Sequence, residues 1–365
     1  MEYLRNAWYV AAWAETLEPG QAISRTICDE PVAIYRRHDG AVAGLADQCP
    51  HRFAPLSMGQ VCEGSNNLEC PYHGLQFDET GDCVVNPHGT GRIPAALKVR
   101  SYPVVESHTL LWVWMGYDEP DVSLIPDFSY LDPGAPGTAS KRDWITLEAD
   151  YRLVVDNLMD LSHASFLHRG ILGNPETLDV ELEIVEDGNT LYVNRTRGDV
   201  APTPMFDLMF KNDRANVDSW SEMRWDAPAN LRHDAGITEP GSPRSEGLLV
   251  RGTHLITPSS KDTCYYHFCA VRISDRVAPA DDDTSIAERL SAMRRFAFDE
   301  QDRPMLEAQQ RAVDRAGGPE FLQPVMLSVD TAPIRARRML ERQIADQGPG
   351  QTGSVTSPVS IALPN

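Results

Sequence analysis

The sequence has few basic residues and no long apolar run. Its 365 residues include 33 Lys and Arg against 53 Asp and Glu, which gives a formal net charge of -20. This charge repels nucleic acid and anionic membrane surfaces, so we expect neither as a partner. No apolar stretch approaches the ~18 residues that a membrane span requires, and the start of the chain lacks the regions of a signal peptide. We therefore expect a cytoplasmic protein.

Signs of a disulfide framework, of internal repeats and of nucleotide binding are also missing. The seven cysteines are an odd number, which argues against a disulfide framework and favours reduced thiols or metal ligands. We find no internal repeat and no nucleotide-binding glycine fingerprint. The chain is longer than one domain usually is, so two domains are expected.

The pattern of the chain predicts an α+β protein with two domains and a tail. Short β-branched and aromatic runs alternate with Gly-containing turns in residues 1–125, which is typical of antiparallel hairpins. A second domain over 126–346 begins in a stretch rich in Pro, Gly and Asp and mixes hairpins with helical patterns at 151–168 and 284–315. Residues 347–365 are rich in Gly, Pro, Ser and Thr, so we expect a loose tail there.

Two loops in the first domain each pair one cysteine with one histidine. Cys49 and His51 occur in Cys-Pro-His, and Cys70 and His73 follow, after eighteen residues, in Cys-Pro-Tyr-His. A Cys2His2 zinc site groups like ligands together, whereas each loop here alternates them. The alternation favours a Rieske [2Fe–2S] cluster, in which both cysteines bind one iron and both histidines bind the other.

A second set of polar residues lies in the first helical pattern. Asn157, Asp160 and His163 recur every three positions and share one helical face, while His168 is five positions further, about 140° round an ideal helix. The two imidazoles could share a metal only if the helix is distorted or ends nearby, and the Arg-Gly pair after His168 favours an end. The alternative is a surface or capped helix whose histidines make ordinary hydrogen bonds.

Two histidines and one carboxylate form the facial triad of non-haem Fe(II) oxygenases, which leaves positions open for O2. The candidate carboxylates are Asp299, Glu300 and Asp302, just before Pro304. Pro304 is expected to kink its helix or to begin a new one, where a side chain can be redirected. Asp299 shares a face with Asp302, so the local pattern leaves the choice between them open.

Both sets of motifs resemble the Rieske non-haem iron oxygenases, over nearly the whole chain. The stretches RNAWYVAAW, CPHRFAPLS, CPYHGLQFD and NPHG and the Asn-x-x-Asp-x-x-His-x-x-x-x-His run are similar to the vanillate O-demethylase oxygenase subunits and dicamba monooxygenase. The resemblance implies a Rieske β-domain, a helix-grip catalytic domain with an antiparallel sheet, and a homotrimer. One departure is a slightly longer loop around residues 65–67, between the two cluster loops.

The resemblance also implies roles for single residues. Asp302, in a segment like QDRPMLEAQQ of the family, completes the iron site with His163 and His168. Asp160 resembles an aspartate that bridges a Rieske histidine and an iron-ligand histidine and thereby orients both rings. Asn157 lies in the outer shell of the iron.

The reaction implied by the resemblance is an O-demethylation. Electrons pass from NADH through a separate flavin and iron–sulfur reductase to the cluster and the iron, and O2 is used to hydroxylate a methoxy carbon. The resulting hemiacetal collapses to a phenol and formaldehyde. The expected substrate is a methoxylated aromatic acid, with vanillate as the first choice.

Substrate-binding residues are less defined by the pattern. His254 aligns with a pocket histidine of the dicamba enzyme that contacts the substrate carboxylate, and His233 falls where that enzyme has an asparagine. Arg232 and Arg251 are further candidates for holding a carboxylate. Two alternative functions are a Rieske monooxygenase that hydroxylates a methyl or ring position, and a Rieske electron carrier, which needs no mononuclear iron.

Overall fold

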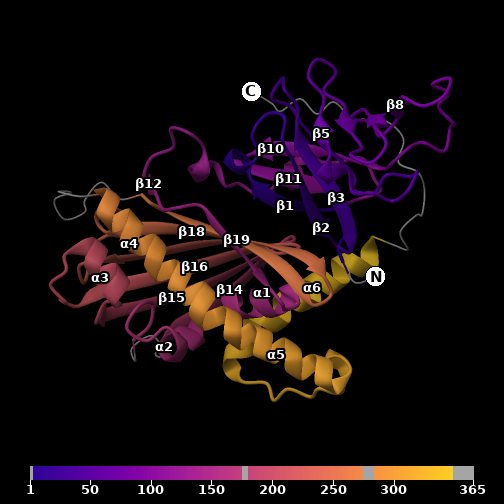
Figure 1. The fold of residues 1–365 in the computed structure, drawn as a ribbon. Coiled ribbons are helices and arrows are strands. Elements are labelled where there is room, and N and C mark those ends of the chain that lie inside the picture. Colours follow the sequence, from indigo (N-terminus) through magenta and orange to yellow (C-terminus); the bar gives the residue numbers. More distant parts are fainter. Residues whose placement is uncertain (1–2, 175–179, 274–282, 348–365) are drawn as a thin grey trace. The chain divides into compact units, whose positions relative to one another are not determined.

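The computed structural model describes residues 3–174, 180–273 and 283–347 (Figure 1). Internal contacts divide the chain into two units. The first unit comprises Met1–Ile125, Thr257–Ser260 and Ile344–Asn365, and the second comprises Pro126–Ile256 and Lys261–Gln343. Strand β18 (Leu248–Ser260) and helix α6 (Thr331–Asp346) therefore each supply residues to both units.

Small antiparallel sheets form the first unit. Their strand orders are β1-β11-β10, β2-β3-β4-β9 and β5-β6-β7-β8. The predicted hairpins are confirmed as the pairs β3–β4 and β7–β8, because a Gly-containing turn joins the strands of each. The strands are β1 (Trp8–Trp13), β2 (Ala22–Ile27), β3 (Glu30–Arg36), β4 (Val42–Ala46), β5 (Gln60–Val61), β6 (Leu68–Glu69), β7 (Gln76–Phe77), β8 (Cys83–Val85), β9 (Ser101–Tyr102), β10 (Val104–Ser107) and β11 (Leu110–Trp114).

A sheet of eight strands forms the second unit. Its order is β12-β19-β18-β17-β16-β15-β14, and β13 also pairs with β19. Strands β12 and β13 pair with β19 in antiparallel orientation, and so do the neighbouring strands from β14 to β18 with one another, so the predicted α+β class with an antiparallel catalytic sheet is confirmed. Besides β18, the strands are β12 (Thr138–Ala139), β13 (Asp143–Leu147), β14 (Glu181–Asp187), β15 (Thr190–Val200), β16 (Val217–Asp226), β17 (Asn230–Thr238) and β19 (Thr263–Arg272).

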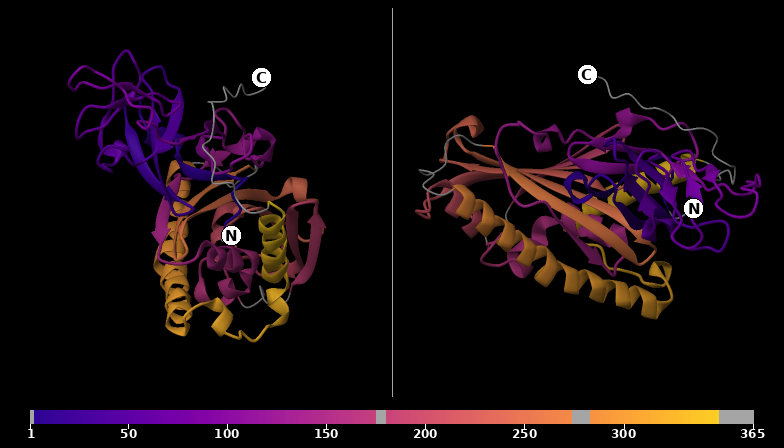
Figure 2. Two further views of the ribbon diagram at one scale, coloured as in Figure 1. Left: turned by 90° about the vertical axis from the view of Figure 1, so that its right-hand side faces the viewer. Right: turned by 45° about the horizontal axis from the view of Figure 1, so that its top comes forward.

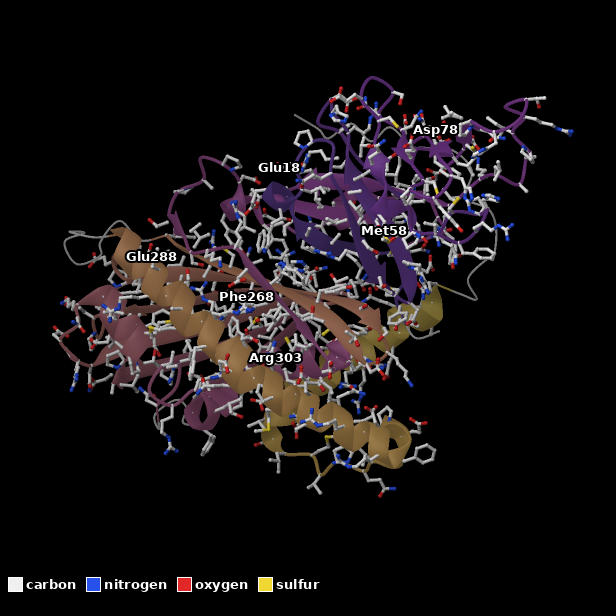
Figure 3. All side chains as sticks on the ribbon, viewed as in Figure 1. Glu18, Met58, Asp78, Phe268, Glu288 and Arg303 are labelled. Carbon is white, nitrogen blue, oxygen red and sulfur yellow. The ribbon has the colours of Figure 1, made fainter. Side chains whose placement is uncertain are left out.

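Helices cover one face of this sheet, and α4 and α5 run along it in Figures 1 and 2. Residues of β16 to β19 pack against α3 and α4 in an apolar core that includes Met209, Ile237 and Leu290. Phe268 of β19 is buried, whereas Glu288 of α4 is exposed to solvent (Figure 3). The helices are α1 (Tyr151–Met159), α2 (Ala164–Leu167), α3 (Pro204–Phe210), α4 (Asp283–Arg295), α5 (Arg303–Ala316) and α6.

The prediction of one helix over 151–168 is wrong. Helix α1 ends at Met159, Asp160 is extended with φ -113° and ψ 99°, and the chain continues in the 3-10 turn η5 (Leu161–His163) and α2. The Asp160 carboxylate accepts hydrogen bonds from the N–H and the hydroxyl of Ser162, at 2.9 and 3.0 Å. Asp160 thus acts as an N-cap, which begins a new helical turn and breaks the old one.

The second helical pattern contains a local distortion. Between α4 and α5 the residues Phe296–Asp302 form a π-helical segment, η8, and Pro304 lies in the first turn of α5. The prediction that Pro304 kinks the helix or begins a new one is therefore confirmed. A π-helical turn is wider than an α-helical one, so it changes the direction in which its side chains point.

The remaining short helical turns lie in connecting segments. They are η1 (Ala14–Thr16), η2 (Leu56–Met58), η3 (Val122–Leu124), η4 (Ser129–Leu131), η7 (Arg244–Glu246), η9 (Pro319–Phe321) and η10 (Ser328–Asp330). In the described part of the chain no helix combines the length and apolar character needed to cross a bilayer. Of the predicted tail, Gln347 donates a hydrogen bond to the carbonyl oxygen of Tyr3 at 2.9 Å, and residues 348–365 lie outside the described ones.

Candidate active site and cluster site

The two Cys-His loops of the first unit share one backbone design. The N–H of Cys49 and that of Cys70 each donate to the carbonyl oxygen five residues further on. The carbonyls of the two cysteines accept from Phe53 and Gly74, which both have positive φ, 61° and 70°. Glycine adopts this conformation freely, whereas Phe53 does so under strain. The two loops are therefore copies of one tight turn, each of which presents one cysteine and one histidine.

The four predicted cluster ligands lie together in the first unit. Cys49 and Cys70 are buried, His51 is exposed and His73 is half-buried, with the centroids of the two imidazole rings 4.5 Å apart. Burial raises the pKa of Cys49 to about 11 in the metal-free chain, and iron would hold such a thiol as a thiolate. Two buried thiols and two imidazoles nearer to the surface are the ligand set of a Rieske cluster. His88, in the NPHG motif, contacts the carbonyl oxygen of His73 at 2.7 Å.

Three side chains of the second unit converge on one point. Nε2 of His168 lies 3.2 Å from Oδ1 of Asp302, and Nε2 of His163 lies 3.7 Å from the same oxygen. Among the described residues, these three form the one group of His, Cys, Asp or Glu whose ligand atoms all lie within 4.8 Å of one another. Two imidazoles and one carboxylate are the donors of a facial triad.

Both histidines are held with the correct nitrogen facing this point. Nδ1 of His163 lies 2.7 Å from the carbonyl oxygen of Asp160, and Nδ1 of His168 lies 2.9 Å from Oε1 of Gln301. Both partners accept hydrogen bonds, so the hydrogen of each neutral ring is on Nδ1. The lone pair of each Nε2 is then free to bind a metal ion.

The backbone distortions bring these residues together. The turn at Asp160 places His163 beside His168, with ring centroids 5.1 Å apart, and the π-helical segment turns Gln301 and Asp302 toward both rings. His163 and His168 would lie about 140° apart on an ideal helix. The break at Asp160 removes this separation, so both imidazoles can bind one metal ion.

The carboxylates Asp299 and Asp302, which the sequence pattern leaves equivalent, have different surroundings. Asp299 forms ion pairs with Arg295 at 2.8 Å and Arg303 at 2.7 Å, whereas Asp302 faces the two histidines. Glu300 is exposed. The geometry favours Asp302 as the metal-binding carboxylate.

Asn157 and Asp160 contact the triad in different ways. The amide nitrogen of Asn157 donates to Oδ1 of Asp302 at 3.3 Å and lies 3.4 Å from Nε2 of His163. Asp160 holds His163 through its carbonyl oxygen, while its carboxylate caps η5. This differs from the expected bridge, in which the carboxylate itself holds the iron-ligand histidine.

Gln301 was not found from the sequence, and we expect its substitution to weaken iron binding. Gln301→Leu removes the acceptor that fixes the tautomer of His168, so the affinity for Fe(II) should fall about 10- to 100-fold. Competition with a chelator measures this affinity, and Glu300→Leu, at an exposed neighbouring position, is the control. Unchanged affinity in Gln301→Leu would show that the hydrogen bond does not support the site.

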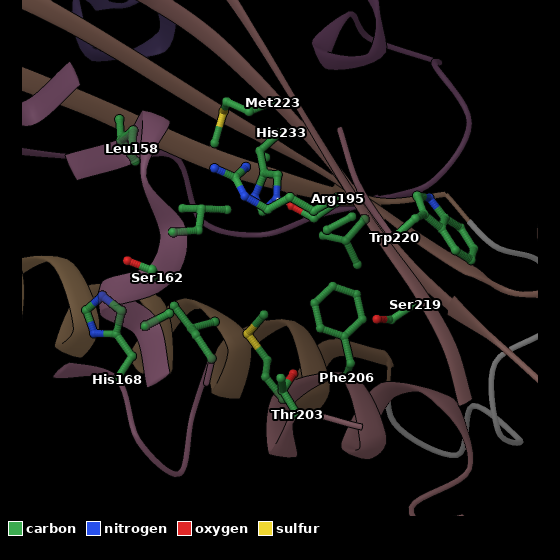
Figure 4. A pocket seen from close by; sticks show the side chains of 18 of the residues that line it. Leu158, Ser162, His168, Arg195, Thr203, Phe206, Ser219, Trp220, Met223 and His233 are labelled. Atoms are coloured by element: carbon green, nitrogen blue, oxygen red, sulfur yellow. The ribbon is translucent and has the colours of Figure 1, made fainter. Parts of the chain in front are cut away.

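A cavity of about 260 Å³ adjoins the triad. It lies between the helices and the inner face of the sheet, and Figure 4 shows His168 on the helix side and His233 on the strand side. Every second residue of a strand points to the same face, and the strand register accordingly brings Arg195, Ser221, Ala235 and Val250 into one row along the cavity. Most of the remaining wall is apolar: Leu158, Leu161, Leu172, Met205, Phe206, Trp220, Met223, Ile237 and Phe298.

The two predicted substrate histidines both line this cavity and are both neutral. Nδ1 of His254 lies 2.5 Å from the hydroxyl of Tyr266, and Nε2 of His233 lies 2.7 Å from the hydroxyl of Ser221. Burial, together with the nearby charge of Arg195, lowers the pKa of His233 to about 4. Burial also lowers the pKa of His254 well below its usual value.

The predicted arginines lie elsewhere. Arg232 and Arg251 face Asp234 at 3.4 and 3.3 Å, and neither lines the cavity. Their neighbours in the strand sequence point to the cavity, so these two side chains belong to the opposite face of the sheet. The structure therefore gives no support to Arg232 or Arg251 as carboxylate-binding residues.

The depressed pKa of His233 predicts a pH dependence of stability. The unfolded chain binds a proton at this histidine near pH 6.5, whereas the folded one does so only near pH 4, so stability falls as the pH drops through this window. Between pH 7 and pH 5 the wild-type protein should lose about 2 kcal/mol more than His233→Asn. Urea unfolding followed in both proteins measures the difference, and equal losses would contradict the prediction.

Comparisons with known proteins agree with both sites. Residues 7–103 match the Rieske [2Fe-2S] domain, and residues 147–346 match the vanillate O-demethylase oxygenase C-terminal domain. The oxygenase component of dicamba O-demethylase from Stenotrophomonas maltophilia is 38% identical, with 94% of this chain and 98% of the relative covered. The vanillate O-demethylase oxygenase subunit of Pseudomonas sp. strain HR199 is 31% identical, with 93% and 95% covered.

Solved structures give the same result. The crystal structure of dicamba monooxygenase bound to 3,6-dichlorosalicylic acid is 35% identical, with a TM-score of 0.86 and with 94% of this chain and 98% of that chain covered. Another structure of that enzyme contains non-haem iron, and the matched Rieske domain carries a [2Fe–2S] cluster, so the two predicted cofactors are those of the family. The chain belongs to the Rieske non-haem iron oxygenases, in the family of the vanillate and dicamba O-demethylase oxygenases.

Proposed function

We propose that the protein is the terminal oxygenase of an O-demethylase that converts a methoxylated aromatic acid, such as vanillate, to a phenol and formaldehyde. The observation that carries this proposal is the cavity that adjoins His163, His168 and Asp302. Its volume of about 260 Å³ lies just below the range of about 300–1,000 Å³ that is usual for ligand pockets, and it suits a compound with one ring. Its apolar walls suit the ring, and its few polar groups suit the substituents.

Each metal-binding residue has one role in this proposal. Cys49, His51, Cys70 and His73 hold the cluster, and His163, His168 and Asp302 hold Fe(II). The bound cofactors supply electrons and activate O2. In the neutral rings of both histidines, the contacts at Nδ1 place the hydrogen on that nitrogen, so Nε2 presents its lone pair to the metal.

Asn157 and Asp160 support the triad. Asn157 donates to Asp302, which fixes one carboxylate oxygen, and Asp160 orients His163. The Asp160 carboxylate is half-buried and accepts from Ser162, and the family resemblance implies that it also accepts a hydrogen bond from a Rieske histidine. We propose Asp160 as a link between the two centres.

His254 and His233 position the substrate. His233 lies on β17 and His254 on β18, whereas the triad belongs to helical segments, so a ring held by the two histidines can present its methoxy group to the iron. Positioning of this kind lowers the activation free energy because the entropic cost of bringing the reacting groups together is met when the substrate binds.

We also propose the partners and the surroundings of the protein. Electrons come from NADH through a separate flavin and iron–sulfur reductase, in line with the name of the dicamba relative, which is the oxygenase component of a larger system. The chain works as a homotrimer in the cytoplasm, where the seven cysteines, which are free in the structure, stay reduced.

A steady-state assay tests the substrate class. The protein is supplied with NADH, O2 and a flavin and iron–sulfur reductase, together with a panel of methoxybenzoates and methylbenzoates. We expect formaldehyde and the matching phenol from the methoxybenzoates, with vanillate among the best. Hydroxylated methylbenzoates without any formaldehyde would instead support the alternative of a methyl or ring hydroxylase.

A further inference from the structure

A carboxylate bound in this cavity needs a positive charge, and the two histidines do not supply one. His233 has a pKa of about 4, and the pKa of His254 is also far below neutral, so both are uncharged at pH 7. A carboxylate that leaves water without a cationic partner loses several kcal/mol. The net charge of -20 gives no general attraction for an anion either. If the substrate is an aromatic acid, as proposed above, a cationic side chain must lie in the cavity wall.

Arg195 of β15 has the required geometry. It lines the cavity, and Figure 4 shows its side chain beside His233 on the strand side. Its Nη2 donates to the carbonyl oxygen of Met159 at 2.7 Å, which anchors the guanidinium group. Its Nη1 is buried and has no hydrogen-bond partner among the described residues. A buried donor without an acceptor is costly to the folded protein unless a ligand satisfies it.

The charge of Arg195 is also not neutralised by an ion pair. Asp160 is near enough to attract it electrostatically, yet within the described residues no carboxylate forms a salt bridge with it. Burial lowers the pKa of Arg195 only to about 10, so the group stays protonated at pH 7. Two other arginines line the cavity. Arg197 already has an interaction partner, and Nη1 of Arg294 donates to the hydroxyl of Ser140 at 2.7 Å.

We propose that Arg195 binds the carboxylate of the substrate through Nη1 and thereby makes the enzyme selective for aromatic acids over uncharged aromatics. The carboxylate then lies on the strand side of the cavity beside His233 (Figure 4), and the ring extends toward the triad, whose residues belong to helical segments. This inference rests on the proposed function for the identity of the acid, but the binding of benzoates can be tested without any turnover.

The test compares a charged ligand with its uncharged analogue. Calorimetry with the oxidised holoenzyme and no reductant, so that no reaction occurs, measures the dissociation constants of vanillate and vanillamide, and of benzoate and benzamide. The wild-type protein should bind each acid more tightly than its amide. In Arg195→Gln this preference should fall by at least about 30-fold, because the buried charge partner is lost, and affinity for the amides should change little.

Two further variants separate binding from folding. Arg195→Lys keeps the charge but not the planar fork, so it should keep part of the preference. Arg232→Gln removes an arginine from the opposite face of the same sheet, where it pairs with Asp234, and should keep all of the preference. The iron content of each variant shows whether the second unit is folded.

The possible outcomes are distinct. A preference for acids that disappears in Arg195→Gln alone supports the proposal, even if no methoxy compound is demethylated, in which case only the proposed reaction fails. A wild-type protein without a preference, or a preference that survives in Arg195→Gln, overturns it. Equal loss of acid and amide binding also overturns it, because Arg195 would then act only in the structure, for example by balancing the charge of Asp160.

Discussion

Asp302→Ala should remove the mononuclear iron and leave the Rieske cluster in place. The variant lacks one of three converging donors, and the two remaining histidines cannot balance the charge of Fe(II). Loss of the metal ion removes several kcal/mol of stabilisation from the reaction, so turnover should fall at least about 1,000-fold. The measurements are the iron content per chain, expected to drop from three to two, and the visible spectrum of the cluster, expected to persist.

Asp299→Ala is the matched control for this substitution. It removes a carboxylate from the same helical segment, but one that pairs with Arg295 and Arg303 instead of facing the histidines. We expect the variant to keep three irons per chain, with some loss of stability because two arginines lose their partner. If iron survives in Asp302→Ala and disappears in Asp299→Ala, the choice of the carboxylate is wrong.

Asp160→Asn should nearly abolish turnover although both metal centres assemble. Asparagine is as good an N-cap as aspartate, and the carbonyl oxygen that holds His163 is unchanged, so the local structure should persist. The negative charge that would link the two centres is lost, and we expect a decrease of about 100-fold in the rate of turnover. The rate at which the reduced cluster is reoxidised in the presence of substrate and O2 measures the same defect directly.

The control for this variant lies on the preceding helix, α1. Asp156→Asn removes a charge there, but the Asp156 carboxylate pairs with Arg337 and does not contact the triad. The reduced cluster of Asp156→Asn should be reoxidised at close to the wild-type rate. A wild-type rate in Asp160→Asn would show that the carboxylate is not needed for communication between the centres, whereas loss of iron would show that its role is structural.

Much of the fold is predictable because its hairpins have local signals. The turns between β3 and β4 and between β14 and β15 contain glycine with an acidic residue beside it, and the flanking runs are rich in β-branched residues. The helix over 151–168 was predicted wrongly because hydrophobic periodicity continues across the break. The available signal was Asp160 itself, which precedes a serine by two positions and can cap a new turn.

The cluster ligands were predictable from spacing, whereas the supports of the iron site were not. Gln301 differs in no local way from its polar neighbours, and only the π-helical segment turns it toward His168. Likewise, Arg195 belongs to a strand in which apolar and polar residues alternate, a pattern that predicts polar side chains facing solvent. Its position in the cavity depends on the pairing of β15 with β16. A local distortion of the helix places Gln301, and long-range strand pairing places Arg195. Neither effect has a signal that could be recognised in the sequence.

The most direct test of the proposed function is a single turnover of the protein without any reductase. Chemically reduced protein is mixed with O2 and vanillate, and formaldehyde and the demethylated phenol are quantified against the mononuclear iron. We expect the two products in equal amounts, up to one of each per iron. An oxygenated product without formaldehyde, or no oxidation of any methoxybenzoate by protein that holds three irons per chain, would contradict O-demethylation as its reaction.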